Sequence, residues 1–105
     1  MEITIKNTDG NIIFKYDCED NTIKKTVEEA VRQKVDLFYV DFYGADLRFA
    51  NLKGAHLNNA YVCNADLRCS QLNKASLNNA DLFKANLYGA DLSNTDFSYA
   101  KFNGA

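Results

Sequence analysis

The residues that could carry out chemistry are few. The chain has one histidine, His56, and three cysteines, Cys18, Cys63 and Cys69. An imidazole beside the hydroxyl of Ser76 would form a base–nucleophile pair, and thiols combined with a histidine are the usual ligands of zinc. The cysteines are odd in number and lack a CxxC spacing, and no glycine-rich phosphate loop is present. We therefore expect no catalysis and no cofactor, and reduced thiols in a cytoplasmic protein.

Carboxylates are the other reactive groups, and they recur at regular intervals. Asp46 and Asp66 are twenty residues apart, and Asp41 and Asp81 are forty apart. Stacked carboxylates can hold a hard cation. The alternative, which we favour, is that each Asp or Asn accepts a hydrogen bond from nearby turn backbone, as in an Asx-turn. No metal site is therefore expected.

The composition excludes two classes of partner. The 105 residues include 12 basic and 14 acidic side chains, which gives a net charge of -2. A protein that binds nucleic acid directly usually has a basic excess or patch, so we expect no such contact. No apolar run approaches the roughly 18 residues of a membrane span. The N-terminal sequence also lacks the basic and apolar regions of a secretory signal.

A five-residue period positions all these side chains. From Asp36 onward every fifth residue is apolar and usually large, in fourteen consecutive positions from Leu37 to Phe102. The residue two positions earlier is small or β-branched, and it is Ala in ten of the fourteen repeats. A period of five fits neither an α-helix nor a strand. We expect a chain that turns a corner every five residues, so that four corners close a square and residue n lies over residue n+20.

The residues at the expected corners support this arrangement. Two positions after each apolar centre, eight of the fourteen residues are Gly or Asn, which tolerate a positive φ and favour type II turns. The chain also contains no Pro. Stacked coils need every backbone N–H for hydrogen bonds between coils, so the absence of Pro is consistent with a solenoid.

The repeats resemble those of a known family. Segments 45–49 (ADLRF), 65–69 (ADLRC) and 90–94 (ADLSN) are similar to the A(D/N)LXX signature of the pentapeptide-repeat proteins. The resemblance covers residues 36–105. It implies an all-β solenoid, a right-handed quadrilateral β-helix of about 3.5 coils. At roughly 4.8 Å per coil, such a solenoid is only about 17 Å long.

Residues 1–35 are expected to cap the first coil and to form one structural unit with the repeats at 36–105. Residues 2–18 read as a β-hairpin and residues 22–34 as an amphipathic helix. Asn21 or Thr22 is a possible N-cap, and Thr26 with Glu29 offers a rival capping box. The segment is similar to caps of phage and bacterial members of the family. A cap would cover an apolar layer and an unpaired ladder that otherwise invite aggregation.

Several outward-facing residues of the first coil are aromatic. They are Phe38, Tyr39, Tyr43 and Phe49. We expect them to pack against the hairpin and the helix rather than to form a ligand site.

The C-terminal coil is a candidate dimer interface. Phe97 and Phe102 replace the Leu of most earlier repeats, and Tyr99 stands nearby. A two-fold, end-to-end stack would cover the apolar layer of both chains with one self-complementary patch. We expect a homodimer. The alternative is a monomer in which these aromatic residues plug the tube.

A second candidate surface is an apolar stripe on one side of the square. Tyr43, Cys63 and Phe83 are spaced by twenty residues, and Tyr61 is close to them. A contiguous exposed apolar stripe can mark an interface with another protein. These residues are the candidate contacts with a partner whose identity the sequence does not give.

Two functions compete. The first is a non-enzymatic scaffold or protein-interaction module. The second comes from the resemblance: some pentapeptide-repeat proteins imitate duplex DNA and modulate type II topoisomerases such as gyrase. A DNA mimic needs a continuous negative potential. Residues 36–105 carry seven acidic and six basic side chains, so we rank the first function higher.

Overall fold

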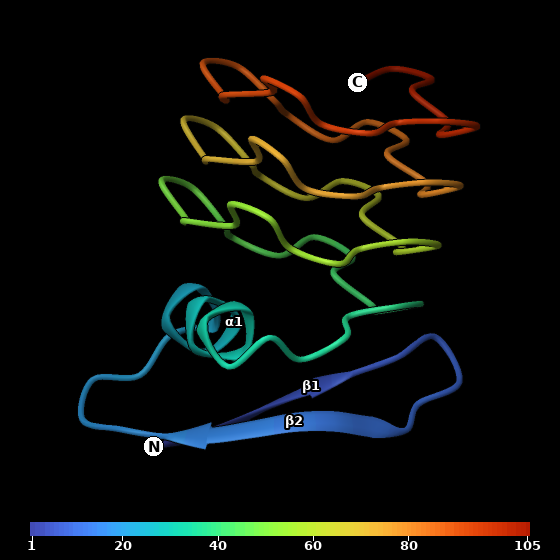
Figure 1. The fold of residues 1–105 in the computed structure, drawn as a ribbon. Coiled ribbons are helices and arrows are strands. Elements are labelled where there is room, and N and C mark those ends of the chain that lie inside the picture. Colours follow the sequence, from blue (N-terminus) through green and yellow to red (C-terminus); the bar gives the residue numbers. More distant parts are fainter.

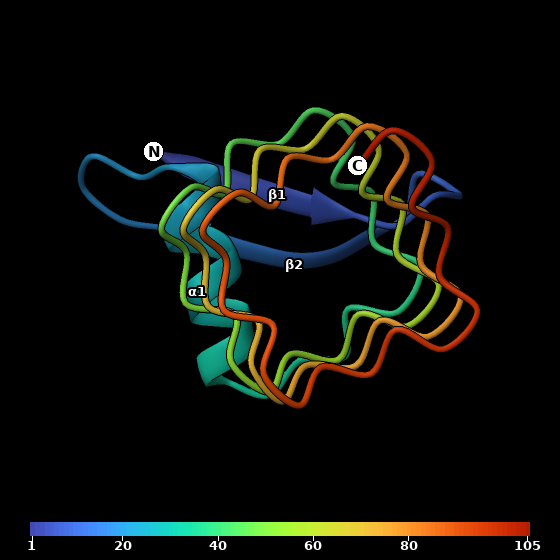
Figure 2. The same ribbon diagram turned by 90° about the horizontal axis from the view of Figure 1, so that it is seen from above.

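The computed structural model describes the whole chain, Met1–Ala105. Three regular elements come first: strand β1 (Glu2–Lys6), strand β2 (Ile12–Asp17) and helix α1 (Ile23–Arg32). The rest of the chain winds into stacked coils with a square outline, and the C-terminus lies at the end of the stack away from β1 and β2 (Figures 1 and 2). No helix has the length and apolar character that crossing a membrane requires.

The coils pair with each other at an interval of twenty residues. Nine parallel bridges join residue n to residue n+20, from Asp41 with Tyr61 up to Asp81 with Lys101. In a typical rung, the backbone N–H of Phe42 donates to the carbonyl of Tyr61, and the N–H of Tyr61 donates to the carbonyl of Val40, both at 2.8 Å. The predicted vertical relation between residues n and n+20 is therefore confirmed.

Every corner of the square has the same backbone conformation. The residue two positions after each apolar centre has a φ between 58° and 71° in all fourteen repeats. The N–H of the next residue then closes the turn, as in the 3.1 Å bond from Ala50 to the carbonyl of Leu47. A positive φ at the third turn residue alone is the mark of a type II turn. The prediction of these turns is confirmed, and the same conformation extends to the six corners that are neither Gly nor Asn.

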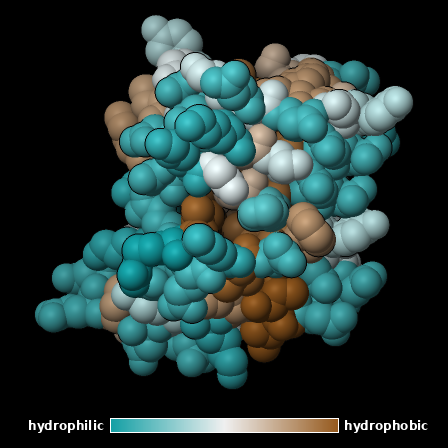
Figure 3. Space-filling model, viewed as in Figure 1, coloured by the Kyte–Doolittle hydropathy of each residue, from teal (hydrophilic) through white to brown (hydrophobic).

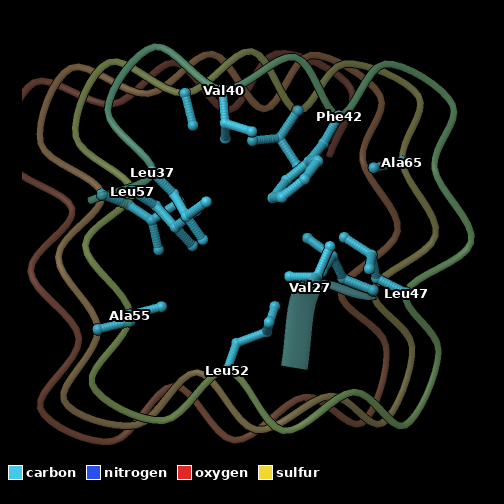
Figure 4. Packing of buried hydrophobic residues seen from close by; sticks show 14 of the residues in the cluster. Val27, Leu37, Val40, Phe42, Leu47, Leu52, Ala55, Leu57 and Ala65 are labelled. Carbon is cyan, nitrogen blue, oxygen red and sulfur yellow. The ribbon is translucent and has the colours of Figure 1, made fainter. Parts of the chain in front are cut away.

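The interior of the square is a packed core. Leu and Ala side chains from all four sides point inward, among them Leu47, Leu52 and Ala55 (Figure 4). Leu47 and Leu67 are buried one above the other, and Leu87 in the next coil packs against them while partly exposed. Two apolar centres near the end of the chain are more open: Leu92 is 38% exposed and Phe102 40%.

The hairpin continues the ladder below the first coil. Strands β1 and β2 pair in antiparallel fashion, and the side chain of Asn7 holds the turn by accepting the N–H groups of Asp9 and Asn11, each at 3.0 Å. Asn7, the first residue after β1, also forms an antiparallel bridge with Val40. The N–H of Asp41 donates to the carbonyl of Lys6 at 2.9 Å. Hairpin and solenoid are thus joined through their backbones.

Thr22, the second of the predicted capping residues, is the N-cap of helix α1. The hydroxyl of Thr22 accepts the N–H of Lys25 at 3.1 Å, which satisfies one of the free donors of the first turn. The helix ends at Arg32 rather than at residue 34, because Lys34 adopts a φ of 61° that turns the chain into the first coil. Its buried face includes Val27, which lies beneath the coil core (Figure 4).

The prediction for the aromatic residues of the first coil is wrong. Phe38, Tyr39, Tyr43 and Phe49 are all exposed rather than packed against the hairpin and helix, and Phe49 only borders a shallow depression beside Thr22 and Ile23 at the start of α1. The space under the first coil is instead filled from below by smaller side chains such as Val27. Residues that point outward from a solenoid face solvent, and a cap at the end of the solenoid does not cover them. These rings therefore stay on the surface.

Candidate interaction surfaces

The residues considered for catalysis do not come together as a pair. His56 and Ser76 are neighbours in adjacent coils. However, the Ser76 hydroxyl donates its hydrogen bond to the side-chain oxygen of Asn58, and the His56 ring lies edge-on to Phe38 with centroids 6.4 Å apart. No group of three or more His, Cys, Asp or Glu side chains has a geometry that could hold a metal ion.

The repeated carboxylates and amides hold the turns. In eight repeats the side-chain oxygen before the apolar centre accepts the N–H two residues later, at 3.0–3.3 Å. This confirms the Asx-turn interpretation of the pattern. The residues are Asp41, Asp46, Asn51, Asp66, Asp81, Asn86, Asp91 and Asp96.

One side of the square carries a ladder of opposite charges. The guanidinium of Arg48 contacts Asp46 at 2.8 Å and that of Arg68 contacts Asp66 at 2.6 Å, and Arg48 also reaches Asp66 in the next coil at 3.8 Å. The hydrogen bonds from Arg48 lower the pKa of Asp46 to about 2. Those from Arg68 lower the pKa of Asp66 as well. These carboxylates are therefore neutralised within the chain.

The next side carries the predicted surface residues Tyr43, Tyr61 and Phe83, which we call the aromatic face. They come from three successive coils and are 59%, 36% and 42% exposed. The rings of Tyr43 and Tyr61 stack with centroids 5.9 Å apart and an interplanar angle of 16°. The structure thus places the three side chains on one side of the solenoid, accessible from solvent.

Cys63 does not belong to the exposed part of this stripe. Its side chain was expected between Tyr43 and Phe83, but only 3% of the residue is accessible. The thiol donates to the carbonyl of Asp81 at 3.8 Å, and burial raises its pKa. A hydrogen bond with Cys63 in turn raises the pKa of Tyr61. Cys63 is therefore a neutral packing residue beneath the aromatic face.

The predicted dimer residues of the last coil differ in how far they are exposed. Phe97 and Phe102 contact each other edge to face at 5.0 Å, and Phe97 is half-buried. Tyr99 lies at a corner and is 86% exposed. Sequence reasoning missed that Leu92 and Tyr88 join Phe102 around a shallow groove at this end. Apolar surface at the end of the stack is visible in Figure 3.

A second feature that sequence reasoning missed lies between α1 and the first coils. A shallow depression there is lined by charged side chains that include Lys25, Glu29, Arg32 and Lys53. Glu29 is buried and forms an ion pair with Arg32, which lowers the pKa of Glu29. Glu28 accepts the N–H of Asn51 at 2.7 Å. These contacts anchor the helix to the solenoid.

Comparisons with known proteins agree with the repeat pattern. The sequence profile of the pentapeptide repeats matches residues 45–82 and 75–105, with eight copies. The crystal structure of HetL, a pentapeptide repeat protein involved in heterocyst differentiation regulation in the cyanobacterium Nostoc sp. strain PCC 7120, is similar. It shares 32% identity over 63% of this chain and 38% of its own, with a TM-score of 0.38.

A second solved structure, the pentapeptide repeat protein Rfr23 from the cyanobacterium Cyanothece 51142, is 26% identical over 64% of this chain and 59% of its own, with a TM-score of 0.33. The chain therefore spans less than two thirds of the length of either structure. No curated protein matches the sequence.

Proposed function

The chain belongs to the pentapeptide-repeat family and has its right-handed β-helix, and we propose that it is a non-enzymatic interaction module. Residues 36–105 provide about three and a half coils, and residues 1–35 cap the first of them. The rigid square stack presents flat sides on which side chains are held in fixed rows. Its role is to bind a partner protein through one of these sides.

The aromatic face is the observation that carries this proposal. Tyr43, Tyr61 and Phe83 expose three rings on one side, whereas the neighbouring side carries the Asp–Arg ladder of Asp46 and Arg48. Exposed aromatic rings grouped on a rigid surface are the usual anchors of protein–protein interfaces. The Leu and Ala core leaves no channel inside the square. This packing supports a binding role over a catalytic one.

The test is a binding experiment with matched variants. The double variant Tyr43→Ala/Phe83→Ala removes the outer rings of the aromatic face, and the control Phe49→Ala removes a ring of similar exposure, 65%, from another part of the surface. A partner captured by the wild-type protein would be identified by mass spectrometry and its binding repeated with purified proteins. We expect the double variant to lose that binding and Phe49→Ala to keep it. Equal binding by the double variant and the wild type would contradict the proposal.

We also propose that two copies associate through the last coil. The partly open side chains of Leu92, Phe97 and Phe102 form an apolar layer there, and a two-fold stack would cover this layer in both copies. Light scattering at tens of micromolar should give the mass of a dimer, and Phe102→Asp should give that of a monomer. A wild-type monomer under these conditions would refute this association.

The alternative function, imitation of DNA towards a type II topoisomerase, has less support. It requires a continuous row of uncompensated negative charge. Asp46 and Asp66 are instead paired with arginines. A gyrase supercoiling assay separates the two functions, because only a DNA mimic should inhibit or protect the enzyme at low micromolar concentration.

A further inference from the structure

Two carboxylates flank the aromatic face. Asp41, Tyr61 and Asp81 stand in one vertical row, because Tyr61 bridges Asp41 in the coil below and Asp81 in the coil above. Neighbouring strands are about 4.8 Å apart, so the two aspartates are separated by two coil rises, about 9.6 Å. Tyr43 and Phe83 lie beside this row in the first and third coils.

These two carboxylates differ from those of Asp46, Asp66 and Asp91 in the repeats. Asp46 and Asp66 are paired with arginines, and Asp91 accepts a hydroxyl hydrogen bond from Ser93. Asp41 and Asp81 each use one oxygen to hold their own turn, accepting an N–H at 3.0 and 3.1 Å. Neither forms an ion pair, and beyond the N–H of its own turn the one donor beside either carboxylate is the weak thiol of Cys63 next to Asp81.

Basic residues adjoin this side at both of its ends, and the first is Lys6 of β1, whose backbone carbonyl accepts the N–H of Asp41. Lys84 places its ammonium 5.2 Å from the centre of the Phe83 ring. Lys101 stands one coil beyond Asp81 and forms no ion pair with it. The part of the side from Asp41 to Asp81 therefore carries two negative charges around an aromatic centre, and its lysines lie in the layer below Asp41 and at or beyond Phe83.

We propose that this surface binds an extended polyproline II segment with two arginine or lysine residues three positions apart, an inference that rests on the interaction role proposed above. A polyproline II helix has three residues per turn and rises about 3.1 Å per residue. Residues i and i+3 therefore point the same way about 9.3 Å apart, close to the spacing of Asp41 and Asp81. In a β-strand the same two residues would point to opposite faces.

The chemistry of the surface fits both parts of such a segment. Each basic side chain donates charge-assisted hydrogen bonds to the free oxygen of Asp41 or Asp81. The residues between them, best as prolines, lie against the rings of Tyr43, Tyr61 and Phe83, since aromatic surfaces accept polyproline II segments readily. Because such a segment is already extended, it loses little conformational entropy on binding.

Two peptides of equal composition test the spacing. The first, Pro-Arg-Pro-Pro-Arg-Pro, carries its arginines three apart, and the second, Pro-Pro-Arg-Arg-Pro-Pro, carries them side by side. Both would be titrated into the whole protein at low salt, with binding followed by fluorescence anisotropy. We expect the first peptide to bind at least fivefold more tightly than the second. Equal affinity would overturn the proposal, as would tighter binding of a helical peptide with arginines seven apart.

Matched variants test the carboxylates. Asp41→Asn/Asp81→Asn keeps the acceptor that holds each turn, as Asn51 and Asn86 already do in the same position. We expect this variant to bind the first peptide at least tenfold more weakly. The control Asp91→Asn/Asp96→Asn changes the net charge equally on other sides and should bind as the wild type does. Equal weakening by both variants would show a nonspecific charge effect and overturn the proposal.

The test of the polyproline II ligand can be distinguished from the test of the interaction role. If a partner protein requires Tyr43 and Phe83 but binds Asp41→Asn/Asp81→Asn normally, the interaction role stands and the basic polyproline II ligand is excluded. If the partner requires all four residues and competes with the first peptide, both are supported.

Discussion

Ser70 is the one residue of the core whose polar atom lacks a partner. It occupies the position that is Ala in ten of the fourteen repeats, and it is 1% exposed. Its hydroxyl has no hydrogen-bond partner. A buried polar group in this state costs about 1–3 kcal/mol. In the same repeat position, Thr95 avoids the cost because its hydroxyl donates to the carbonyl of Leu72 at 2.7 Å.

This contrast predicts opposite effects of removing the two hydroxyls. Ser70→Ala should stabilise the protein by about 1 kcal/mol, which corresponds to a rise in Tm of roughly 4–8 °C for a domain of this size. Thr95→Val, which removes a bonded hydroxyl, should destabilise it by about 1 kcal/mol. Thermal denaturation followed by circular dichroism measures both. A lower Tm for Ser70→Ala would contradict the unpaired state of its hydroxyl.

The pKa of Asp46 provides a test of the charge ladder. Its value of about 2 lies below the ordinary value near 3.8, because Arg48 donates hydrogen bonds to the carboxylate. The folded state therefore binds this proton less readily than the unfolded state, so its contribution to stability is complete above about pH 4 and is lost as the pH falls through 2. A carboxyl titration followed by NMR should show this pKa in the wild type.

The matched variants for this titration are Arg48→Met and Lys74→Met. Arg48→Met should raise the pKa of Asp46 towards its ordinary value, whereas Lys74→Met, on another side of the square, should leave it in place. An unchanged pKa in Arg48→Met would show that the arginine is not its cause.

At the level of the repeat, the corners depend on what lies in the adjacent coil. Gly54 and Gly89 have nearly the same φ, 70° and 71°. A Cβ built on Gly54 would meet nothing within 4 Å, but one on Gly89 would lie 3.1 Å from the sulfur of Cys69 in the coil below. A glycine above a larger corner residue therefore has a packing role in addition to its backbone freedom.

This difference predicts unequal costs for the same substitution. Gly54→Ala should cost about 1 kcal/mol, the strain of an L-residue at positive φ. Gly89→Ala should cost more, because the Cys69 side chain must also move. The variant Cys69→Ala should reduce the cost of Gly89→Ala to that of Gly54→Ala, and urea denaturation would measure each difference. Equal costs in the presence of Cys69 would argue against the contact.

The elements differ in how far the sequence could predict them. The repeat of Ala and Leu predicted the square coil, because inward positions recur every five residues whatever the other side chains are. The positive φ at Phe49 or Lys74 could not be read from residue type, since the geometry of the closed square imposes it. Likewise, the burial of Cys63 depends on neighbouring coils rather than on its place in the repeat.

The candidate surfaces, too, could be predicted from the sequence only in part. The spacing of twenty residues correctly placed Tyr43 and Phe83 on one side. It could not show that Asp46 is neutralised while Asp41 is free, because that depends on whether Arg or Tyr follows two residues later and on how that side chain folds back.

For the whole molecule, stability should vary along the tube. Leu67 is buried with coils above and below it, whereas Leu92 has only one coil against it. Leu67→Ala should cost about 2–5 kcal/mol through the cavity it leaves. Leu92→Ala should cost no more than about 1.5 kcal/mol, since this side chain is partly in water already. Urea denaturation compares them, and equal costs would contradict the inward, stacked position of Leu67.

The twenty-residue coil also determines which insertions leave the arrangement of the surface residues unchanged. Five residues inserted between Cys69 and Ser70 would advance all later segments by a quarter turn, and Phe83 would then sit above Arg68 instead of above Cys63. An insertion of twenty residues would lengthen the tube and return each later segment to its original orientation. Tyr43, Tyr61 and Phe83 therefore stay on one side of the solenoid when whole coils of twenty residues are gained or lost. A gain or loss of five, ten or fifteen residues between them moves them to different sides.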